Sequence, residues 1–180
     1  INNFKTVDDR RISQLNFENV GINADQIVAT GDEAEQLIKD AINYGTLCVS
    51  AEAVGCMESC YLKTVEYTKS REQFGQPISN FQVLQHKMVD MFIEAELCKS
   101  LLYKSMIDMH ENNDSKYRSV SALKSQVGLS GKKVGEDAVQ LHGGMGVSEE
   151  MSIGHYLKRF ISIDSQFGNS HFHLKKFNNS

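Results

Sequence analysis

Apolar residues between positions 84 and 102 recur at alternating steps of four and three, and this spacing constrains the fold more than any other feature of the sequence. Side chains at those steps share one face of an α-helix, and an apolar face of that length must be buried against other helices. The face comprises Leu84, Met88, Met91, Ala95, Cys98 and Leu102. A second such face follows the break at HENNDSK and comprises Val120, Leu123, Val127, Val134, Ala138 and Leu141. The pattern predicts long helices packed into a bundle.

Further helices are expected on both sides of this pair. A long helix would begin near residue 31, where Thr30 or Asp32 can cap its N-terminus. Its apolar face would comprise Leu37, Ala41, Tyr44, Cys48, Ala51, Leu62 and Val65. After HGGMGV, the sequence predicts a shorter helix at about 149–160, a loop and a C-terminal helix.

Three glycines lie beside the apolar face of the third helix: Gly128, Gly131 and Gly135. Glycine weakens a helix by about 1 kcal/mol relative to alanine, so three in one helix indicate a close approach of neighbouring helices. The sequence therefore predicts an all-α fold, with residues 31–180 forming an antiparallel four- or five-helix bundle.

Residues 1–30 differ from the rest in pattern. In RISQLNFENVGI, Leu15 and Phe17 alternate with polar residues, and Asn19 and Gly21 are turn formers, which indicates a short strand and a turn. Such a segment is too small to make a stable sheet by itself. We expect residues 1–30 to be the end of a larger β domain that precedes the helical domain.

The composition excludes several classes of protein. A net charge of −4 argues against binding a nucleic-acid backbone, which requires a basic face. No apolar run approaches the roughly 18 residues that a membrane span requires. The four cysteines lie at helical spacings, as small apolar side chains of a reducing compartment would: Cys48, Cys56, Cys60 and Cys98. We expect a cytoplasmic protein, with a targeting segment removed before Ile1 as the alternative.

The loop SREQFGQPI carries the sequence's one proline and side chains that a simple turn does not require. Arg71 offers a planar set of donors suited to phosphate, and Phe74 offers a ring for stacking. Gly75 allows a positive φ and a tight turn. The alternative is a surface connection between two helices with a solvated arginine.

The second loop, VQLHGGMGVSEE, places two glycines directly after a helix. At Gly143 and Gly144 a ligand could approach bare main-chain amides, and Gln140 adds an amide side chain. The alternative is an ordinary glycine C-cap.

In this order and spacing, the two loops resemble those of the C-terminal helical domain of the flavoprotein acyl-CoA dehydrogenases. The shared pattern is RxxFGxxI, then FQ, then QxxGGxGxxxE, and the resemblance extends from about residue 10 to the end. It implies that the cofactor is FAD, whose ADP portion, in a neighbouring subunit, would be bound by Arg71, Gln73 and Phe74. Near the same cofactor would lie Phe81 and Gln82. Its pyrophosphate and adenosine would be lined by Gln140, Leu141, His142, Gly143 and Gly144. A flavin held by two chains implies at least a dimer.

The sequence departs from the family where the reaction needs a base. A carboxylate removes the α-proton of an acyl-CoA thioester while a hydride leaves the β-carbon for the flavin. The usual Glu lies in a Y-E-G-T turn, and a count without gaps from HGGMGV places that position at Phe167, before Gly168. Some members carry the Glu on the first helix, where this sequence has Gly45 followed by Thr46 in place of a frequent Arg. The nearest carboxylate, and a candidate replacement base, is Asp164.

The tail FGNSHFHLKKF resembles the FGD-x-x-HHL-x-R ending of subunits of heteromeric acyl-CoA dehydrogenases, in which one chain carries the base and its partner helps complete the flavin site. His171 and His173 are interpreted as structural, and no metal site is expected from an H-x-H pair without further ligands. Glu149 and Glu150 are interpreted as caps of the next helix.

Two functions follow from the resemblance. The first is the C-terminal part of an FAD-dependent dehydrogenase that acts on an acyl-CoA and passes electrons to an acceptor, as a homodimer, a tetramer or a heteromer, with its base displaced or supplied by a partner. The second is a non-catalytic assembly subunit of such a heteromer. In either case the 180 residues alone are expected to be inactive.

Overall fold

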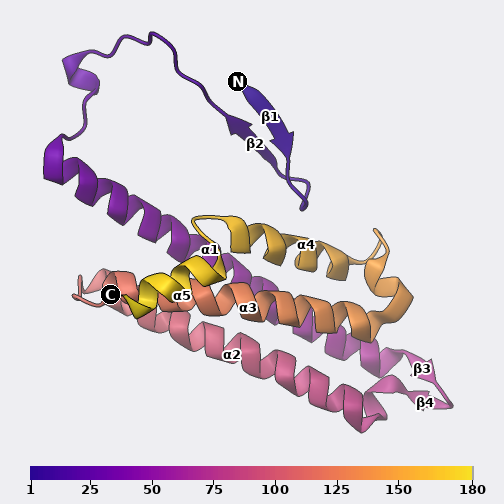
Figure 1. Cartoon of the computed structure of the whole chain (residues 1–180). Helices are drawn as coiled ribbons and strands as arrows, with labels where there is room; N and C mark the ends of the chain where they lie inside the picture. Colours follow the sequence, from indigo (N-terminus) through magenta and orange to yellow (C-terminus); the bar gives the residue numbers. More distant parts are fainter. Residues whose placement is uncertain (180) are drawn as a thin grey trace.

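The computed structural model describes residues 1–179, and in this part of the chain five α-helices form an antiparallel bundle. They are α1 (Gly31–Ser70), α2 (Gln82–His110), α3 (Lys116–His142), α4 (Ser152–Ser165) and α5 (Ser170–Asn178). Figure 1 shows α2 antiparallel to both α1 and α3, with α4 and α5 crossing the other side of α3. The predicted all-α bundle is confirmed. Among these residues, no helix combines the length and apolar content that crossing a bilayer requires.

Two small hairpins and three 3-10 helices complete the described elements. Strands β1 (Asn2–Lys5) and β2 (Arg11–Gln14) pair antiparallel, as do β3 (Glu72–Gln73) and β4 (Gln76–Pro77). The 3-10 helices are η1 (Ala24–Gln26), η2 (Ile78–Asn80) and η3 (Gly143–Val147). The strand expected around Leu15 and Phe17 lies earlier in the chain: because Gln14 pairs with Asn2, both residues lie beyond the end of the partner strand.

The core lies along α2 and α3, where the sequence predicted it. All six apolar residues expected on α3 are buried, and on α2 the face from Met91 to Leu102 is buried, with Leu84 and Met88 packed against it. Cys60 and Cys98 belong to this core, and burial raises the pKa of their thiols to about 12 and about 11. Cys48, by contrast, is exposed.

The prediction of the apolar face on α1 is wrong for most of its residues, although Ala51 is half-buried and packs against the core. Tyr44 and Leu62 are 52% and 49% exposed. The buried residues of α1 are instead Asn43, Thr46, Ser50, Ala53, Val54, Met57, Cys60, Thr64 and Thr68. The hydroxyls of Thr46, Ser50 and Thr64 donate to carbonyls four residues earlier, at 2.7 to 2.8 Å. Because these hydroxyls are satisfied within their own helix, small polar residues can face the core.

The glycines of α3 allow α4 to pack closely against it, as predicted. A Cβ at Gly131 would lie 3.0 Å from the Phe160 ring, and one at Gly135 would lie 3.0 Å from Leu157. At both positions a larger residue would push α4 away from the core, so the glycines set the distance between the two helices.

The β1–β2 turn is fixed to the bundle by a charged cluster. Arg159 of α4, which is 7% exposed, donates from Nη1 to Asp8 at 2.7 Å. It also donates to both carboxylate oxygens of Glu52 in α1, at 2.8 and 2.6 Å, and these hydrogen bonds lower the pKa of Glu52. Arg10 donates to the same carboxylate at 2.9 Å. One arginine therefore joins the hairpin to two helices.

The α2–α3 turn is built around the carboxylate of Asp108, which is 5% exposed. It accepts hydrogen bonds from the Ser119 hydroxyl, from Lys104 Nζ at 2.9 Å and from Asn113 at 3.2 Å. Led by the bond from Ser119, these hydrogen bonds lower the pKa of Asp108 to about 2.

A carboxylate whose pKa is lower in the folded state stabilises the fold above its unfolded pKa of about 3.9, and this contribution is lost as the pH falls toward 2. We therefore expect Asp108→Asn to lower the Tm at pH 7, with the difference from the parent shrinking between about pH 4 and pH 2. Thermal unfolding followed by circular dichroism measures this. Asp114→Asn, at an exposed position of the same turn, is the control. Equal effects of the two substitutions would contradict the assignment.

Candidate functional site

The two loops singled out in the sequence lie at the same end of the bundle, because α1 and α3 run in the same direction and end side by side (Figure 1). The ring of Tyr67, near the end of α1, stacks on His142, the last residue of α3, with centroids 4.2 Å apart. The Tyr67 hydroxyl also donates to the His142 carbonyl at 3.4 Å. The structure thus joins the first loop to the second through one aromatic pair.

The first loop is a tight hairpin with an unusual residue at its tip. Phe74 and Gly75 both have positive φ, +54° and +78°. A two-residue turn of this kind favours Asn-Gly, and phenylalanine in the left-handed region is strained. The Phe74 side chain is 92% exposed, with Phe81 as an edge-on neighbour at 6.1 Å. An exposed aromatic ring held in a strained turn indicates a surface that contacts another molecule.

The polar side chains of this loop also face outward. Arg71, Gln73 and Gln82 are exposed, and Phe81 is half-buried. The Arg71 carbonyl accepts a hydrogen bond from Ile78 at 2.8 Å, which closes the base of the hairpin and leaves the guanidinium on its surface. The loop therefore presents a cation and an aromatic ring on one exposed hairpin.

The second loop exposes some of its predicted residues and buries others. Gly143 ends α3 with a φ of +59°, and there is open space around the Cα atoms of both Gly143 and Gly144. Gln140 is exposed. Leu141 and His142 are buried, and the His142 ring is hydrogen-bonded to the Ala138 carbonyl at 2.8 Å. Burial lowers the pKa of His142. These two residues pack inside the bundle next to the turn, whereas Gln140, Gly143 and Gly144 are exposed.

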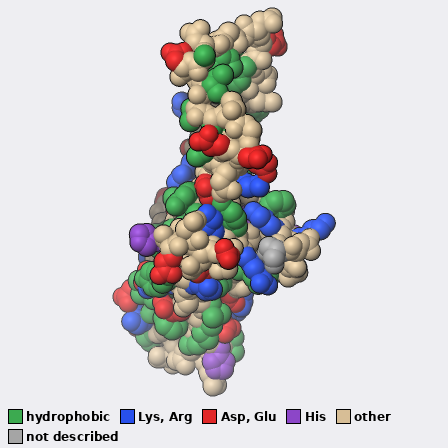
Figure 2. Space-filling model, turned by 90° about the vertical axis from the view of Figure 1, so that its left-hand side faces the viewer, with side chains coloured by type: hydrophobic (Ala, Val, Ile, Leu, Met, Phe, Trp, Pro, Cys, Tyr) green, Lys and Arg blue, Asp and Glu red, His purple; other side chains and the backbone are tan. Residues whose placement is uncertain are grey.

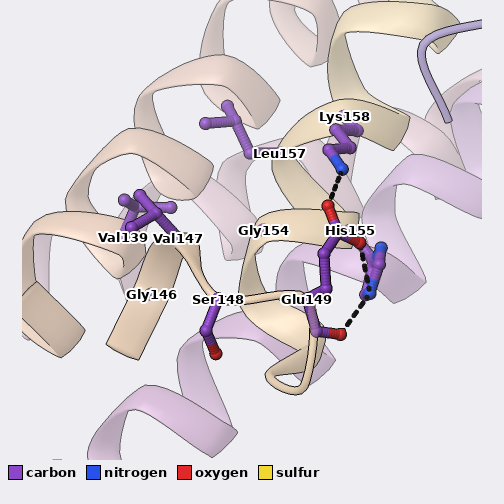
Figure 3. A pocket seen from close by; sticks show the side chains of 9 residues that line it. All are labelled: Val139, Gly146, Val147, Ser148, Glu149, Gly154, His155, Leu157 and Lys158. Carbon is purple, nitrogen blue, oxygen red and sulfur yellow. Dashed lines mark hydrogen bonds and ion pairs between the residues drawn. The ribbon is translucent and has the colours of Figure 1, made fainter. Parts of the chain in front are cut away.

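A small pocket lies behind this loop, between η3 and α4 (Figure 3). Its volume is about 180 Å³, below the 300 Å³ or more of typical ligand pockets. Glu149 crosses it to Lys158 at 2.8 Å, and its carbonyl lies 3.1 Å from His155 Nε2. The role expected for Glu149 as a helix cap is therefore wrong, because α4 begins at Ser152 and Glu149 pairs with a residue farther along it.

The two positions where the resemblance places a catalytic Glu meet in space. Phe167 lies in the α4–α5 loop, and its ring packs on α1 at Gly45. A Cβ at position 45 would lie 2.6 Å from Cζ of that ring and 2.9 Å from Cε1. Phe167 has a φ of +56° and is 46% exposed. Thr46 is buried and donates to the Ile42 carbonyl at 2.7 Å. An aromatic ring thus fills the space beside Gly45.

Asp164, the candidate replacement base, is engaged in the same loop. Its Oδ1 accepts a hydrogen bond from the Ser170 amide at 2.9 Å, at the start of α5. It lies so close to α3 that a Cβ at Gly128 would be 2.1 Å from that oxygen. The structure therefore gives Asp164 of α4 a role in joining α4 to the start of α5, and Gly128 of α3 makes room for its carboxylate.

Sequence reasoning missed Lys124, which is fully buried beneath this loop. Its Nζ donates to the carbonyls of Asp164 at 2.9 Å and Gly168 at 2.8 Å. The signal was present, since Lys124 is four residues after Val120 on the apolar face of α3. His173, which the sequence predicted as structural, donates from Nε2 to the Phe167 carbonyl at 3.0 Å.

The structure is a helical-bundle domain with exposed polar and aromatic side chains on two loops at one end. A family model described as "Acyl-CoA dehydrogenase, C-terminal domain" matches residues 36–175. The short-chain-specific acyl-CoA dehydrogenase of Megasphaera elsdenii is 29% identical over 147 residues, covering 81% of this chain and 38% of that protein.

Solved structures show the same architecture. Butyryl-CoA dehydrogenase from Megasphaera elsdenii matches with a TM-score of 0.85 at 25% identity, over 91% of this chain and 42% of that one. The ChsE4–ChsE5 complex from Mycobacterium tuberculosis matches in fold with a TM-score of 0.89 at 21% identity, over 99% of this chain and 47% of that one.

The chain belongs to the acyl-CoA dehydrogenase family. It spans between 34% and 39% of the length of the first relatives that it matches.

The contact between Gly45 and Phe167 predicts a difference between two glycines of α1. Replacing a helical glycine by alanine stabilises by about 1 kcal/mol, and Gly55, which has open space around it, should show this gain as a higher Tm. Gly45→Ala should lose or reverse the gain, because its methyl group meets the Phe167 ring. In a Phe167→Ala background both substitutions should stabilise alike. Equal gains with Phe167 present would rule out the contact.

Proposed function

We propose that this chain is the C-terminal part of an FAD-dependent acyl-CoA dehydrogenase that removes hydrogen from the α- and β-carbons of an acyl-CoA thioester. One observation carries the proposal: two outward-facing loops with the family's motif meet at one end of the bundle, joined by Tyr67 and His142. When bound, FAD supplies the hydride acceptor. Electrons then pass to a separate acceptor protein.

Each loop contributes a different kind of contact to the cofactor. In this proposal Arg71 pairs with the phosphates of an FAD in a neighbouring subunit, with Gln73 beside it, while Phe74 stacks on that FAD. The exposed tip of the hairpin supports this, because Phe74 extends away from its own bundle. Phe81 and Gln82 lie at the base of the same loop.

The glycine loop supplies main-chain donors. The open space at Gly143 and Gly144 allows a pyrophosphate to approach their amides, and Gln140 adds a side-chain amide. Leu141 and His142 are buried and keep the turn in place. A flavin bound by loops of two chains makes the functional unit a dimer or a larger assembly.

We propose that the catalytic base lies at neither of the two positions, 45 and 167, where the family carries its Glu. Phe167 cannot accept a proton, its ring fills the space beside Gly45, and the Asp164 carboxylate is occupied by the Ser170 amide. A partner subunit of a heteromer would supply the carboxylate. The same observations favour a second candidate function, a non-catalytic assembly subunit, but a subunit that binds no flavin has no use for the open glycine turn at Gly143 and Gly144.

The N-terminal segment is proposed to be the edge of a larger β domain. Its large apolar side chains are 50% to 89% exposed, namely Phe4, Ile12, Leu15, Phe17, Val20, Ile22 and Val28. Figure 2 shows hydrophobic side chains at the surface of this segment, at the top of the view. Further strands would cover them, and the Asp8–Arg159 pair would fix that domain on the bundle.

Cofactor binding is tested with the whole protein in its native assembly. Arg71→Ala should weaken FAD binding by about tenfold or more, because a charge-assisted hydrogen bond is lost. The flavin absorbance of purified protein, titrated with FAD, measures the effect. Lys69→Ala removes the same charge two residues earlier and should leave FAD binding unchanged. Colourless parent protein that takes up no FAD would support the assembly role instead.

The position of the base is tested by putting a carboxylate at position 167. The parent without a partner should not reduce its flavin with acyl-CoA thioesters, whereas Phe167→Glu should gain this reaction and Phe167→Gln should not. Bleaching of the flavin under anaerobic conditions measures it. Reduction by the parent as a homo-oligomer would contradict the missing base.

A further inference from the structure

The buried lysine beneath the α4–α5 loop has an unusual set of partners. Lys124 is 0% exposed, a rare state for lysine, and the acceptors of its ammonium in the described residues are main-chain carbonyls. One belongs to Asp164 near the C-terminal end of α4, where a positive charge is favoured, and the other to Gly168. Burial lowers the pKa of Lys124. Burying a cation is costly, and the two hydrogen bonds to carbonyls offset part of that cost.

His173 completes the support from α5. It is 2% exposed, and its Nε2 lies 3.0 Å from the Phe167 carbonyl. Since a carbonyl only accepts hydrogen bonds, Nε2 carries the proton, and the buried Nδ1 has no hydrogen-bond partner within residues 1–179. Burial lowers the pKa of His173, in keeping with the neutral ring.

The backbone of Phe167, in the loop held by Lys124 and His173, is strained. Phe167 and Gly168 have φ values of +56° and +100°, and the left-handed region strains a phenylalanine in a way that other contacts can compensate. The compensation is visible: the carbonyls of both residues are held, one by His173 and the other by Lys124. That conformation brings the Phe167 ring against Gly45.

We propose that Lys124 and His173 are positioning residues, which hold the main chain at residue 167 so that its side chain faces the space beside Gly45. They act through hydrogen bonds to the loop and touch neither substrate nor cofactor. The identity of residue 167 then determines which chemical group the loop presents to the site. Lys124 and His173 determine where that group lies. The catalytic meaning of this arrangement depends on the proposed function; the positioning itself does not.

A purely structural role makes a different prediction. If the two residues only joined α4 and α5 to α3, their loss would lower the Tm and leave the Phe167 ring in place in the molecules that stay folded. Positioning predicts a change at residue 167 under conditions in which the helices remain folded.

The test uses the whole protein with 4-fluorophenylalanine incorporated only at position 167. In the parent we expect a narrow ¹⁹F resonance, reporting one ring position. Lys124→Met and His173→Leu should shift and broaden it at a temperature where circular dichroism shows full helicity. His173→Gln keeps an N–H donor near the position of Nε2 and should retain the parent resonance. An unchanged resonance in Lys124→Met and His173→Leu would overturn the proposal.

Matched controls come from the same helices. Lys132→Met removes an exposed lysine of α3, and His171→Leu removes an exposed histidine of α5. Neither should alter the resonance. If Lys124→Met does not fold, the pair His173→Leu and His173→Gln decides the outcome. These spectra need no flavin, so absence of FAD binding would refute the proposed function and leave this result standing.

A second measurement connects positioning to the reaction. In the Phe167→Glu background, Lys124→Met should slow flavin reduction at saturating acyl-CoA by about 10- to 100-fold, because a displaced carboxylate meets the α-carbon less often. The acyl-CoA concentration that gives half the maximal rate should change little, because neither residue touches the substrate. An unchanged maximal rate would show that residue 167 keeps its place without Lys124.

Discussion

The close packing of α3 is the constraint on which the other elements depend. This helix contacts α1, α2, α4 and α5, and therefore has a neighbour on nearly every side. Gly128, Gly131 and Gly135 bring α4 and the start of α5 within reach, since even a methyl group at these positions would meet Asp164, Phe160 or Leu157. With α4 that close, the α4–α5 loop lies over Lys124, and the ring of Phe167 in this loop reaches Gly45 of α1. The geometry of the candidate site thus begins with three residues that have no side chain.

Two phenylalanines in the left-handed region mark the two places where this chain differs from a simple bundle. Phe74 is at the tip of an exposed hairpin, and Phe167 is in the loop that covers Gly45. The hairpin has open surroundings, which suits a contact with another molecule. The second loop is held by hydrogen bonds from α3 and α5, which suits a fixed wall. The same backbone strain, a phenylalanine with positive φ, therefore occurs in one exposed loop and in one closely packed loop.

The sequence predicted much of the fold and less of the site. The faces of α2 and α3 were predictable because large apolar residues recur at helical spacing. The buried face of α1 was not, because Thr46, Ser50 and Thr64 satisfy their hydroxyls within the helix, and a hydropathy pattern does not register this. The two loops were recognisable from their motifs. The burial of Lys124 could have been inferred from its place on the apolar face of α3, four residues after Val120. The contact between Phe167 and Gly45 depends on how distant helices pack, which no local pattern contains.

The stacking of Tyr67 on His142 has a consequence for how the two loops move. Tyr67 lies in the last turn of α1 and His142 is the last residue of α3, so fraying at the end of α1 removes a packing partner from the end of α3, and the reverse also holds. We expect the loops to belong to one unit of local unfolding and to open together. A molecule that orders either loop then lowers the entropy cost of ordering the other. We therefore expect the two loops to bind cooperatively, even where a ligand touches only one of them.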